Sequence, residues 1–234
     1  MHLVLVCSFF WILDSGFWLL IMKIGIFGGT FDPIHVGHLR VAGEFAAAFG
    51  LDKVLMMVAA TPPHRAPPVA SPEDRLRMVK LAVQKFPDLT ASDIELVREG
   101  PSFTLDTVQE VRESAGGALI WMALGGDAYA LIRSWHRPED VLAQTQLVVL
   151  TRPGYSVDLM APLPKGMSER YTLSGDTYVH DSGATLRTLQ VSPLNVSSSM
   201  IRKAVSEGDS IGDLVTVEVL QYIRQKDLYR LETM

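Results

Sequence analysis

The sequence predicts a single doubly wound, Rossmann-like α/β domain with a mostly parallel sheet and helices at its C-terminal end. Two observations predict it: short apolar runs alternate with segments of helical periodicity, and glycine or proline turns follow several of the apolar runs. The length of 234 residues suits one such domain. Ligands of these folds bind beyond the carboxyl ends of the strands, so the turns after the strands are the first candidates for a site.

The composition excludes several classes of protein. Apolar residues make up 48% of the chain and charged residues 20%, as in globular proteins rather than disordered ones. The net charge of -5 argues against a nucleic-acid-binding surface. Cys7 is the single cysteine, which excludes an intrachain disulfide and disfavours a thiolate metal site. We therefore expect a cytoplasmic protein with neither a nucleic-acid partner nor a metal site built from its own side chains.

Residues 1–21 form an almost entirely apolar N-terminal extension, interrupted near Asp14. A signal peptide needs a positive start and a small-residue cleavage site, but no Lys or Arg precedes Lys23. A carboxylate in mid-span is costly for a membrane anchor. We therefore expect translation to start at Met22, so that residues 22–234 form the domain and no membrane is involved. A membrane-tethered protein is the alternative.

An apolar strand over residues 23–27 opens the domain and runs into Gly28 and Gly29. A helix follows from near Val36, with large apolar residues at four-residue intervals. Gly50 is expected to end this helix in a left-handed conformation.

A second strand over residues 53–58 leads into a loop, residues 59–70, that four prolines deny regular structure. Ser71 is expected to cap the next helix, with Pro72 in its first turn and Asp74 completing a capping box.

The later elements are weaker, and residues 153–187 receive no assignment. The pattern predicts a strand over 89–94, a helix over 104–114, strands over 118–124, 147–151 and 188–191, and helices over 197–207 and 214–226.

The segment GGTFDPIHVGHL, residues 28–39, carries the strongest chemical signal. Its two glycines allow close approach of a ligand, and the helix N-terminus that follows favours phosphate. His35 and His38 lie three residues apart, on one side of a helical turn. Protonated or as neutral donors, they could stabilise charge on a transferring phosphoryl group. An ordinary glycine turn and a surface histidine pair are the alternatives, and a metal site would need more ligands.

This segment resembles the GTFDP and HxGH signatures of the nucleotidyltransferase superfamily. Within it, residues 22–230 resemble the bacterial nicotinate-nucleotide adenylyltransferases, so residues 22–234 are expected to be a nucleotidyltransferase domain. Phosphopantetheine adenylyltransferases usually carry threonine where this chain has His35. The resemblance implies that His35 and His38 are catalytic, supported at the phosphates by Gly28, Gly29 and Thr30.

A second motif, VSSSMIR over residues 196–202, resembles the family's ISSTxIR. Ser197 is suited to cap a helix whose first N–H groups face an anion, and Arg202 one turn later can fork onto phosphate. A capped helix with a surface arginine is the alternative. The resemblance implies a catalytic Arg202 and phosphate binding by Ser197 and Ser198, while Ser199 keeps the hydroxyl of the usual threonine.

Further segments match the family around the two substrates. His64 and Arg65 lie in a TPPHR stretch that resembles the family's PPHK/R loop, although a solvated rigid loop is equally consistent. Gly125 and Asp127 follow a strand, where a carboxylate commonly accepts ribose hydroxyls. Trp135 is suited to stack on a pyridine ring, with a buried core residue as the alternative.

Two matches carry a departure or a competing explanation. Phe103 and Thr104 lie in PSFT, which resembles the family's PSYT at the nicotinate ring, but phenylalanine lacks the usual tyrosine hydroxyl. Arg152 begins RPGY, which the resemblance places near the nucleotide, although a structural role is also possible.

The resemblance implies an enzyme of NAD biosynthesis. It would transfer AMP from ATP to nicotinate mononucleotide, giving nicotinate adenine dinucleotide and pyrophosphate, with Mg²⁺ arriving on ATP. Another nucleotidyltransferase, such as a cytidylyltransferase or phosphopantetheine adenylyltransferase, and a nucleotide-binding protein without activity are the alternatives. The sequence predicts neither the oligomeric state nor the strength of preference for nicotinate over nicotinamide mononucleotide.

Overall fold

The computed structural model of the chain describes residues 21–60, 67–192 and 194–230. The predicted N-terminal extension, apart from Ile21, lies outside the described residues, as do His64 and Arg65. No helix within the described part of the chain has the length and apolar character needed to cross a membrane.

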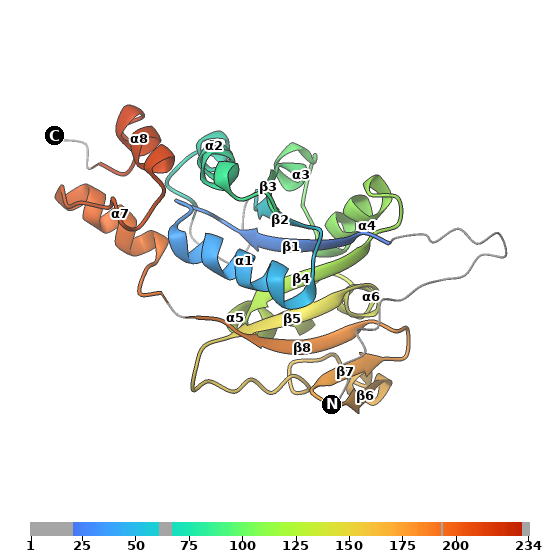
Figure 1. Ribbon diagram of the computed structural model, residues 1–234. Helices are drawn as coiled ribbons and strands as arrows, with labels where there is room; N and C mark the ends of the chain where they lie inside the picture. Colours follow the sequence, from blue (N-terminus) through green and yellow to red (C-terminus); the bar gives the residue numbers. More distant parts are fainter. Residues whose placement is uncertain (1–20, 61–66, 193, 231–234) are drawn as a thin grey trace, which may run out of the picture.

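A single eight-stranded sheet with the order β3-β2-β1-β4-β5-β8-β7-β6 forms the centre of the protein (Figure 1). Its strands are β1 (Lys23–Gly29), β2 (Lys53–Val58), β3 (Leu89–Ser92), β4 (Leu119–Gly125), β5 (Gln146–Thr151), β6 (Tyr171–Ser174), β7 (Thr177–His180) and β8 (Thr185–Gln190). All strand pairs from β3 to β8 are parallel, and only the β6–β7 and β7–β8 pairs are antiparallel. The predicted doubly wound, mostly parallel α/β fold is therefore confirmed.

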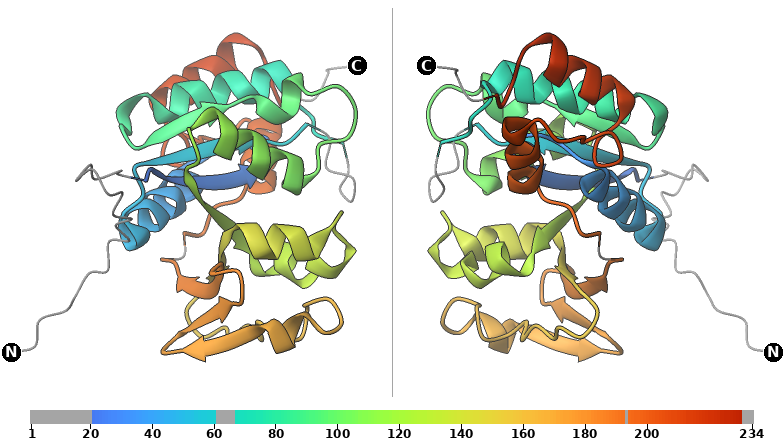
Figure 2. Two further views of the ribbon diagram at one scale, coloured as in Figure 1. Left: turned by 90° about the vertical axis from the view of Figure 1, so that its right-hand side faces the viewer. Right: turned by 90° about the vertical axis from the view of Figure 1, so that its left-hand side faces the viewer.

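Helices cover both faces of the sheet. They are α1 (Val36–Phe49), α2 (Pro72–Ala82), α3 (Ile94–Val97), α4 (Thr104–Ser114), α5 (Gly126–Ala130), α6 (Pro138–Gln144), α7 (Ser198–Glu207) and α8 (Val217–Gln225). Side chains of α1, α2, α7 and α8 join one hydrophobic cluster, and those of α4, α5 and α6 join a second cluster. Figure 2 shows α2 and α8 at one end of the molecule and the β6–β7 hairpin at the other.

The strand β1 is buried on both faces, which explains its continuous apolar sequence. Its neighbours are β2 on one side and β4 on the other, with Gly28 opposite Met57 and Phe27 opposite Ala123. This register brings the carboxyl ends of the three strands together, at the point where the strand order reverses.

Local signals place several helix ends as predicted. Gly50 ends α1 with φ of 57°, in the left-handed region. The Ser71 side chain accepts a hydrogen bond from the Asp74 N–H at 3.1 Å, which confirms the N-cap. The reciprocal half of the predicted capping box is wrong, because the Asp74 carboxylate accepts from the Ser71 hydroxyl instead of the Ser71 N–H.

The weaker predictions needed correction. The strand predicted over residues 89–94 ends at Ser92, and a short helix, α3, follows. The unassigned residues 153–187 contain β6, β7 and the start of β8, which begins three residues earlier than predicted. The last helix, α8, is shorter than the predicted 214–226. The hairpin was missed because its strands are short and half exposed, so their stability comes from pairing with β8.

Candidate active site

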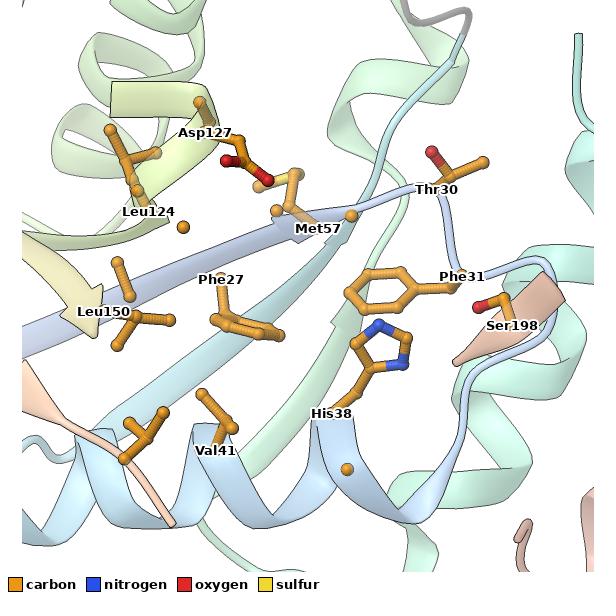
Figure 3. Close-up of a pocket in the computed structure, with 18 of the residues that line it drawn as sticks. Phe27, Thr30, Phe31, His38, Val41, Met57, Leu124, Asp127, Leu150 and Ser198 are labelled. Atoms are coloured by element: carbon orange, nitrogen blue, oxygen red, sulfur yellow. The ribbon is translucent and has the colours of Figure 1, made fainter. Parts of the chain in front are cut away.

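A cleft of about 1130 Å³ lies beyond the carboxyl ends of β1, β4 and β5. Figure 3 shows its parts: His38 and Val41 come from α1, and Asp127 from α5 lies across the site from Ser198 of α7. The cleft gathers most of the predicted site residues from five separate segments. They are Gly28, Gly29, Thr30, His35, His38, Thr104, Gly125, Asp127, Trp135, Arg152, Ser197, Ser198 and Arg202.

His35 and His38 form a reciprocal cap at the start of α1. Nδ1 of His35 accepts from the N–H of His38, and Nδ1 of His38 accepts from the N–H of His35, each at 3.3 Å. The rings are stacked, with centroids 3.7 Å apart and planes inclined by 21°. Since each Nδ1 is an acceptor, each ring carries its proton on Nε2. The pair therefore presents two N–H donors held in a fixed orientation.

Both imidazoles are neutral at physiological pH. Burial lowers the pKa of His35 to about 4. Burial, together with the charge that His35 would carry, lowers the pKa of His38 to about 3. The sequence left open whether the pair acts protonated or neutral, and these pKa values favour neutral hydrogen-bond donors.

Two glycines of the first motif are required by close packing. A Cβ at Gly29 would lie 2.8 Å from the Phe31 ring, whose edge-on contact with His38 has a centroid distance of 5.1 Å. A Cβ at Gly37 would lie 2.9 Å from Val196 and 3.0 Å from Nδ1 of His35. Gly37 thus lets the segment before α7 approach the histidine pair.

The helix α7 is docked on the first motif by its own polar residues. Ser197 caps it by accepting from the Met200 N–H at 3.2 Å. The Ser198 hydroxyl donates to the carbonyl of Pro33 at 2.8 Å. Arg202 donates to the carbonyl of Asp32 at 2.7 Å. The first turns of α1 and α7 therefore face one cleft, and the positive ends of both helix dipoles favour an anion there.

Asp32 is a residue whose role the sequence analysis did not identify. It lines the cleft, is only 4% exposed, and accepts hydrogen bonds from the N–H groups of Val69 and Ala70 at 2.8 and 3.1 Å. The Tyr229 hydroxyl donates to the same carboxylate at 2.9 Å. This carboxylate ties two distant segments, at Val69–Ala70 and at Tyr229, to the first motif.

Arg75 was also missed. It is fully buried, and its guanidinium donates to the carbonyls of Thr30, Ala59 and Ala60 at 2.7–3.1 Å. It fixes the chain just after β1 and β2. A signal was present in the sequence, because Arg75 lies on the apolar stripe of its helix, three and four residues before Met78 and Val79.

The other wall of the cleft contains Trp135 and the start of α4. Thr104 is the first residue of α4, and the N-cap residue Phe103 makes no side-chain hydrogen bond to the helix. Phe103 itself does not line the cleft: it is 39% exposed and stacks on His136, with a centroid distance of 4.2 Å. Phe103 thus lies beside two residues that line the cleft, Thr104 and Trp135, without lining it itself.

Glu95 also lines the cleft. Its carboxylate accepts from the Thr107 hydroxyl at 3.1 Å, and burial raises its pKa. Within the described ranges, no three His, Cys, Asp or Glu side chains group as metal ligands.

Comparison with known sequences places this chain among nucleotide-transferring enzymes. The profile of the cytidylyltransferase-like family matches residues 26–204. The chain is 39% identical over 211 residues to a probable nicotinate-nucleotide adenylyltransferase of Pseudomonas putida strain GB-1, covering 90% of this chain and 96% of that protein. A protein of the same name from Pseudomonas syringae pv. tomato is 40% identical, with coverage of 89% and 94%.

Solved structures show the same fold. A nicotinic acid mononucleotide adenylyltransferase from Plasmodium falciparum, complexed with NaAD, superposes with a TM-score of 0.66 at 18% identity, covering 89% of this chain and 97% of that one. A putative nicotinate-nucleotide adenylyltransferase from Vibrio parahaemolyticus gives a TM-score of 0.59 at 20% identity, with coverage of 91% and 98%.

Proposed function

The chain belongs to the cytidylyltransferase-like family, and within that family we infer that it is a nicotinate-nucleotide adenylyltransferase of NAD biosynthesis. The reaction joins nicotinate mononucleotide to the AMP part of ATP and releases pyrophosphate. The names of the relatives agree with the activity expected from the HxGH and SSSMIR motifs.

One observation carries the assignment: the N-termini of α1 and α7 open onto one cleft, with His35, His38 and Arg202 beside them. Backbone N–H groups, neutral imidazole donors and a guanidinium form a set suited to the phosphates of ATP. The opposite wall, with Trp135 and the start of α4, offers an aromatic surface and further N–H groups for a second nucleotide.

The chemistry is a direct displacement at the α-phosphorus of ATP. An oxygen of the acceptor's 5′-phosphate forms a bond to that phosphorus, and the bond to the bridging oxygen of the pyrophosphate breaks. The acceptor phosphate is already ionised, so the site must position it and stabilise charge rather than remove a proton. We assign the stabilisation to the Nε2–H groups of His35 and His38 and to Arg202, with Thr30 and the backbone at Gly28 and Gly29 beside them.

The remaining cleft residues divide between the two substrates. Ser197 and Ser198 present the first N–H groups of α7 to phosphate, and Asp127 accepts ribose hydroxyls near Gly125 and Arg152. Trp135 stacks on the pyridine ring. The acceptor-binding roles of His64, Arg65 and Phe103 stay predictions. The first two residues lie outside the described residues, and Phe103 does not line the cleft.

Recognition of the nicotinate acid is assigned to the start of α4. Its N-cap residue, Phe103, supplies no side-chain acceptor, so the first N–H groups of the helix are available to a carboxylate. The side chain of Thr104 lines the cleft at this point. Donors built to pair a carboxylate are left partly unpaired by an amide, which predicts rejection of nicotinamide mononucleotide.

Magnesium is proposed to arrive with ATP. Mg²⁺ is usually held by phosphate oxygens, water and one or two protein oxygens rather than by a cage of side chains. The Thr30 hydroxyl lies among the residues that line the cleft at the phosphate side and would supply such a protein oxygen. When bound, the ion supplies neutralising charge to the pyrophosphate leaving group.

The start of translation at Met22, a catalytic domain over residues 22–234 and a cytoplasmic location also stay predictions. Mass spectrometry of the N-terminus of the natural protein, with fractionation of the cell, tests the three together.

The function is tested by measuring pyrophosphate release with Mg²⁺, from ATP and in separate reactions from CTP. Each nucleotide is combined with one of three acceptors: nicotinate mononucleotide, nicotinamide mononucleotide or phosphopantetheine. Turnover with the first acceptor alone is expected. Turnover only with another acceptor would keep the chemistry and overturn the substrate. ATP binding without pyrophosphate release from any acceptor would indicate a binding protein, and release from CTP alone would indicate a cytidylyltransferase.

A further inference from the structure

Tyr229, in the last described turn of the chain, contacts the active-site residue Asp32. Tyr229 is 8% exposed, and its hydroxyl donates to Oδ1 of Asp32 at 2.9 Å across a separation of 197 residues. Its backbone has φ of 67°, in the left-handed region that residues other than glycine rarely adopt. Such a conformation persists where the surroundings hold it, and it commonly marks a functional position.

The Tyr229 hydroxyl is a permanent donor. Burial and the adjacent negative charge of Asp32 raise its pKa above the ordinary value for tyrosine, so the phenol keeps its proton. The carboxylate of Asp32 receives two more hydrogen bonds, from the Val69 N–H to Oδ2 and from the Ala70 N–H to Oδ1. Three donors therefore fix the orientation of one buried carboxylate.

The fixed carboxylate lies next to the guanidinium of Arg202. Nη1 of Arg202 is 2.7 Å from the main-chain oxygen of Asp32, to which it donates, but 3.7 Å from the nearest carboxylate oxygen, Oδ2. The donors on the carboxylate compete with the arginine for its lone pairs. Arg202 is thereby oriented by Asp32 without a short ion pair. Its Nη2 also donates to the Ser199 hydroxyl at 3.3 Å, and the N–H groups outside these two bonds are left for a ligand.

We propose that Tyr229 is a positioning residue for the transfer reaction, acting through Asp32 to hold Arg202 at the phosphates. The proposal rests on the assignment of Arg202 to the phosphates. Without the hydroxyl, the carboxylate keeps only the N–H donors of Val69 and Ala70, so it is held less firmly and can shift to narrow the 3.7 Å gap to Arg202. Such a shift draws the guanidinium away from the transition state.

The variant that tests this is Tyr229→Phe, which keeps the ring and removes only the hydroxyl. A matched control exists on α8: the Tyr222 hydroxyl donates to the Asp74 carboxylate at 2.8 Å, and neither residue lines the cleft. Each variant loses one tyrosine–aspartate hydrogen bond. Tyr229→Phe is expected to lower kcat on the order of tenfold with an unchanged KM for nicotinate mononucleotide, because only the position of Arg202 changes. Tyr222→Phe is expected to keep the kcat of the parent.

A double-mutant cycle separates positioning from structure. In an Arg202→Lys background, which removes the forked donor, Tyr229→Phe is expected to have no further effect on kcat. For Arg202 variants whose turnover is too slow to measure, the same cycle is carried out on the affinity for ATP, determined by calorimetry.

The outcomes distinguish the proposal from the function on which it rests. Wild-type turnover by Arg202→Met, which removes the positive charge, would refute the phosphate assignment itself. Loss of turnover in Arg202→Lys with a normal kcat in Tyr229→Phe would overturn the positioning role alone. Equal losses of kcat in Tyr229→Phe and Tyr222→Phe, or additive losses in the cycle, would reduce Tyr229 to a structural residue.

Discussion

The packing around Gly37 gives a quantitative test of the histidine pair. In Gly37→Ala, the new Cβ would lie 2.9 Å from Cγ1 of Val196, 3.0 Å from Nδ1 of His35 and 3.1 Å from its Cε1. Carbon atoms in contact prefer separations of about 3.5–4.0 Å, so these neighbours must move by roughly 0.5–1 Å. His35 cannot move alone, because the same Nδ1 accepts from His38. A misplacement of about 1 Å in a catalytic group costs roughly 10²-fold in rate, and we expect this loss in kcat/KM.

Gly43 provides the control, because it lies in the same helix and a Cβ there meets nothing within 4 Å. Gly43→Ala is expected to raise the free energy of unfolding by about 0.5–1 kcal/mol, since alanine favours the helix over glycine, and to leave the kinetics unchanged. Gly37→Ala is expected to raise the free energy of unfolding less than Gly43→Ala does, because its new Cβ makes the close contacts described above. The assays are steady-state pyrophosphate release and denaturant unfolding of both variants. A Gly37→Ala enzyme with wild-type kcat/KM, or an equal loss in Gly43→Ala, would refute the argument.

Four further predictions follow from the site. The lowered pKa values of His35 and His38, about 4 and 3, mean that below pH 6.5 the unfolded chain binds protons at these histidines more readily than the folded protein does. The free energy of unfolding should therefore fall as the pH drops from 6.5 to 5, by roughly 2 kcal/mol for each histidine. Urea unfolding of the parent and of His38→Gln across this range measures it, and an equal dependence of the free energy of unfolding on pH in the two proteins would contradict the argument. The kcat of His38→Ala should fall by at least tenfold, since a neutral donor to the transferred phosphoryl group is lost, and near-normal turnover would remove His38 from the mechanism. Ser197→Ala should destabilise the protein by about 1 kcal/mol through loss of the α7 cap, measured by urea unfolding, with no change counting against the cap. Arg75→Met leaves the carbonyls of Thr30, Ala59 and Ala60 without their buried donor and should cost about 3 kcal/mol or more in the same assay, whereas a change below about 1 kcal/mol would show that these carbonyls find other partners.

The sequence alone determined the parts of this protein that depend on neighbours along the chain. The strand β1 with its glycine turn, the Gly50 end of α1 and the Ser71 cap follow from local pattern and capping chemistry. The two motifs likewise predicted that phosphate-binding helix starts exist, and the alternation of elements predicted that they meet at the sheet's carboxyl edge.

The tertiary structure decided what depends on partners far along the chain. Neutral imidazoles result from burial and stacking of His35 on His38, and no spacing rule supplies the desolvation that lowers their pKa. Phe103 stacks on His136, which comes from another loop, and the PSFT pattern gave no sign of this partner. Arg202 is oriented through Asp32, and Asp32 by Tyr229, across separations of 170 and 197 residues. A sequence pattern shows which chemical groups the chain contains. Only folding determines which of them are buried together, because burial and hydrogen bonding depend on proximity in space and not along the chain.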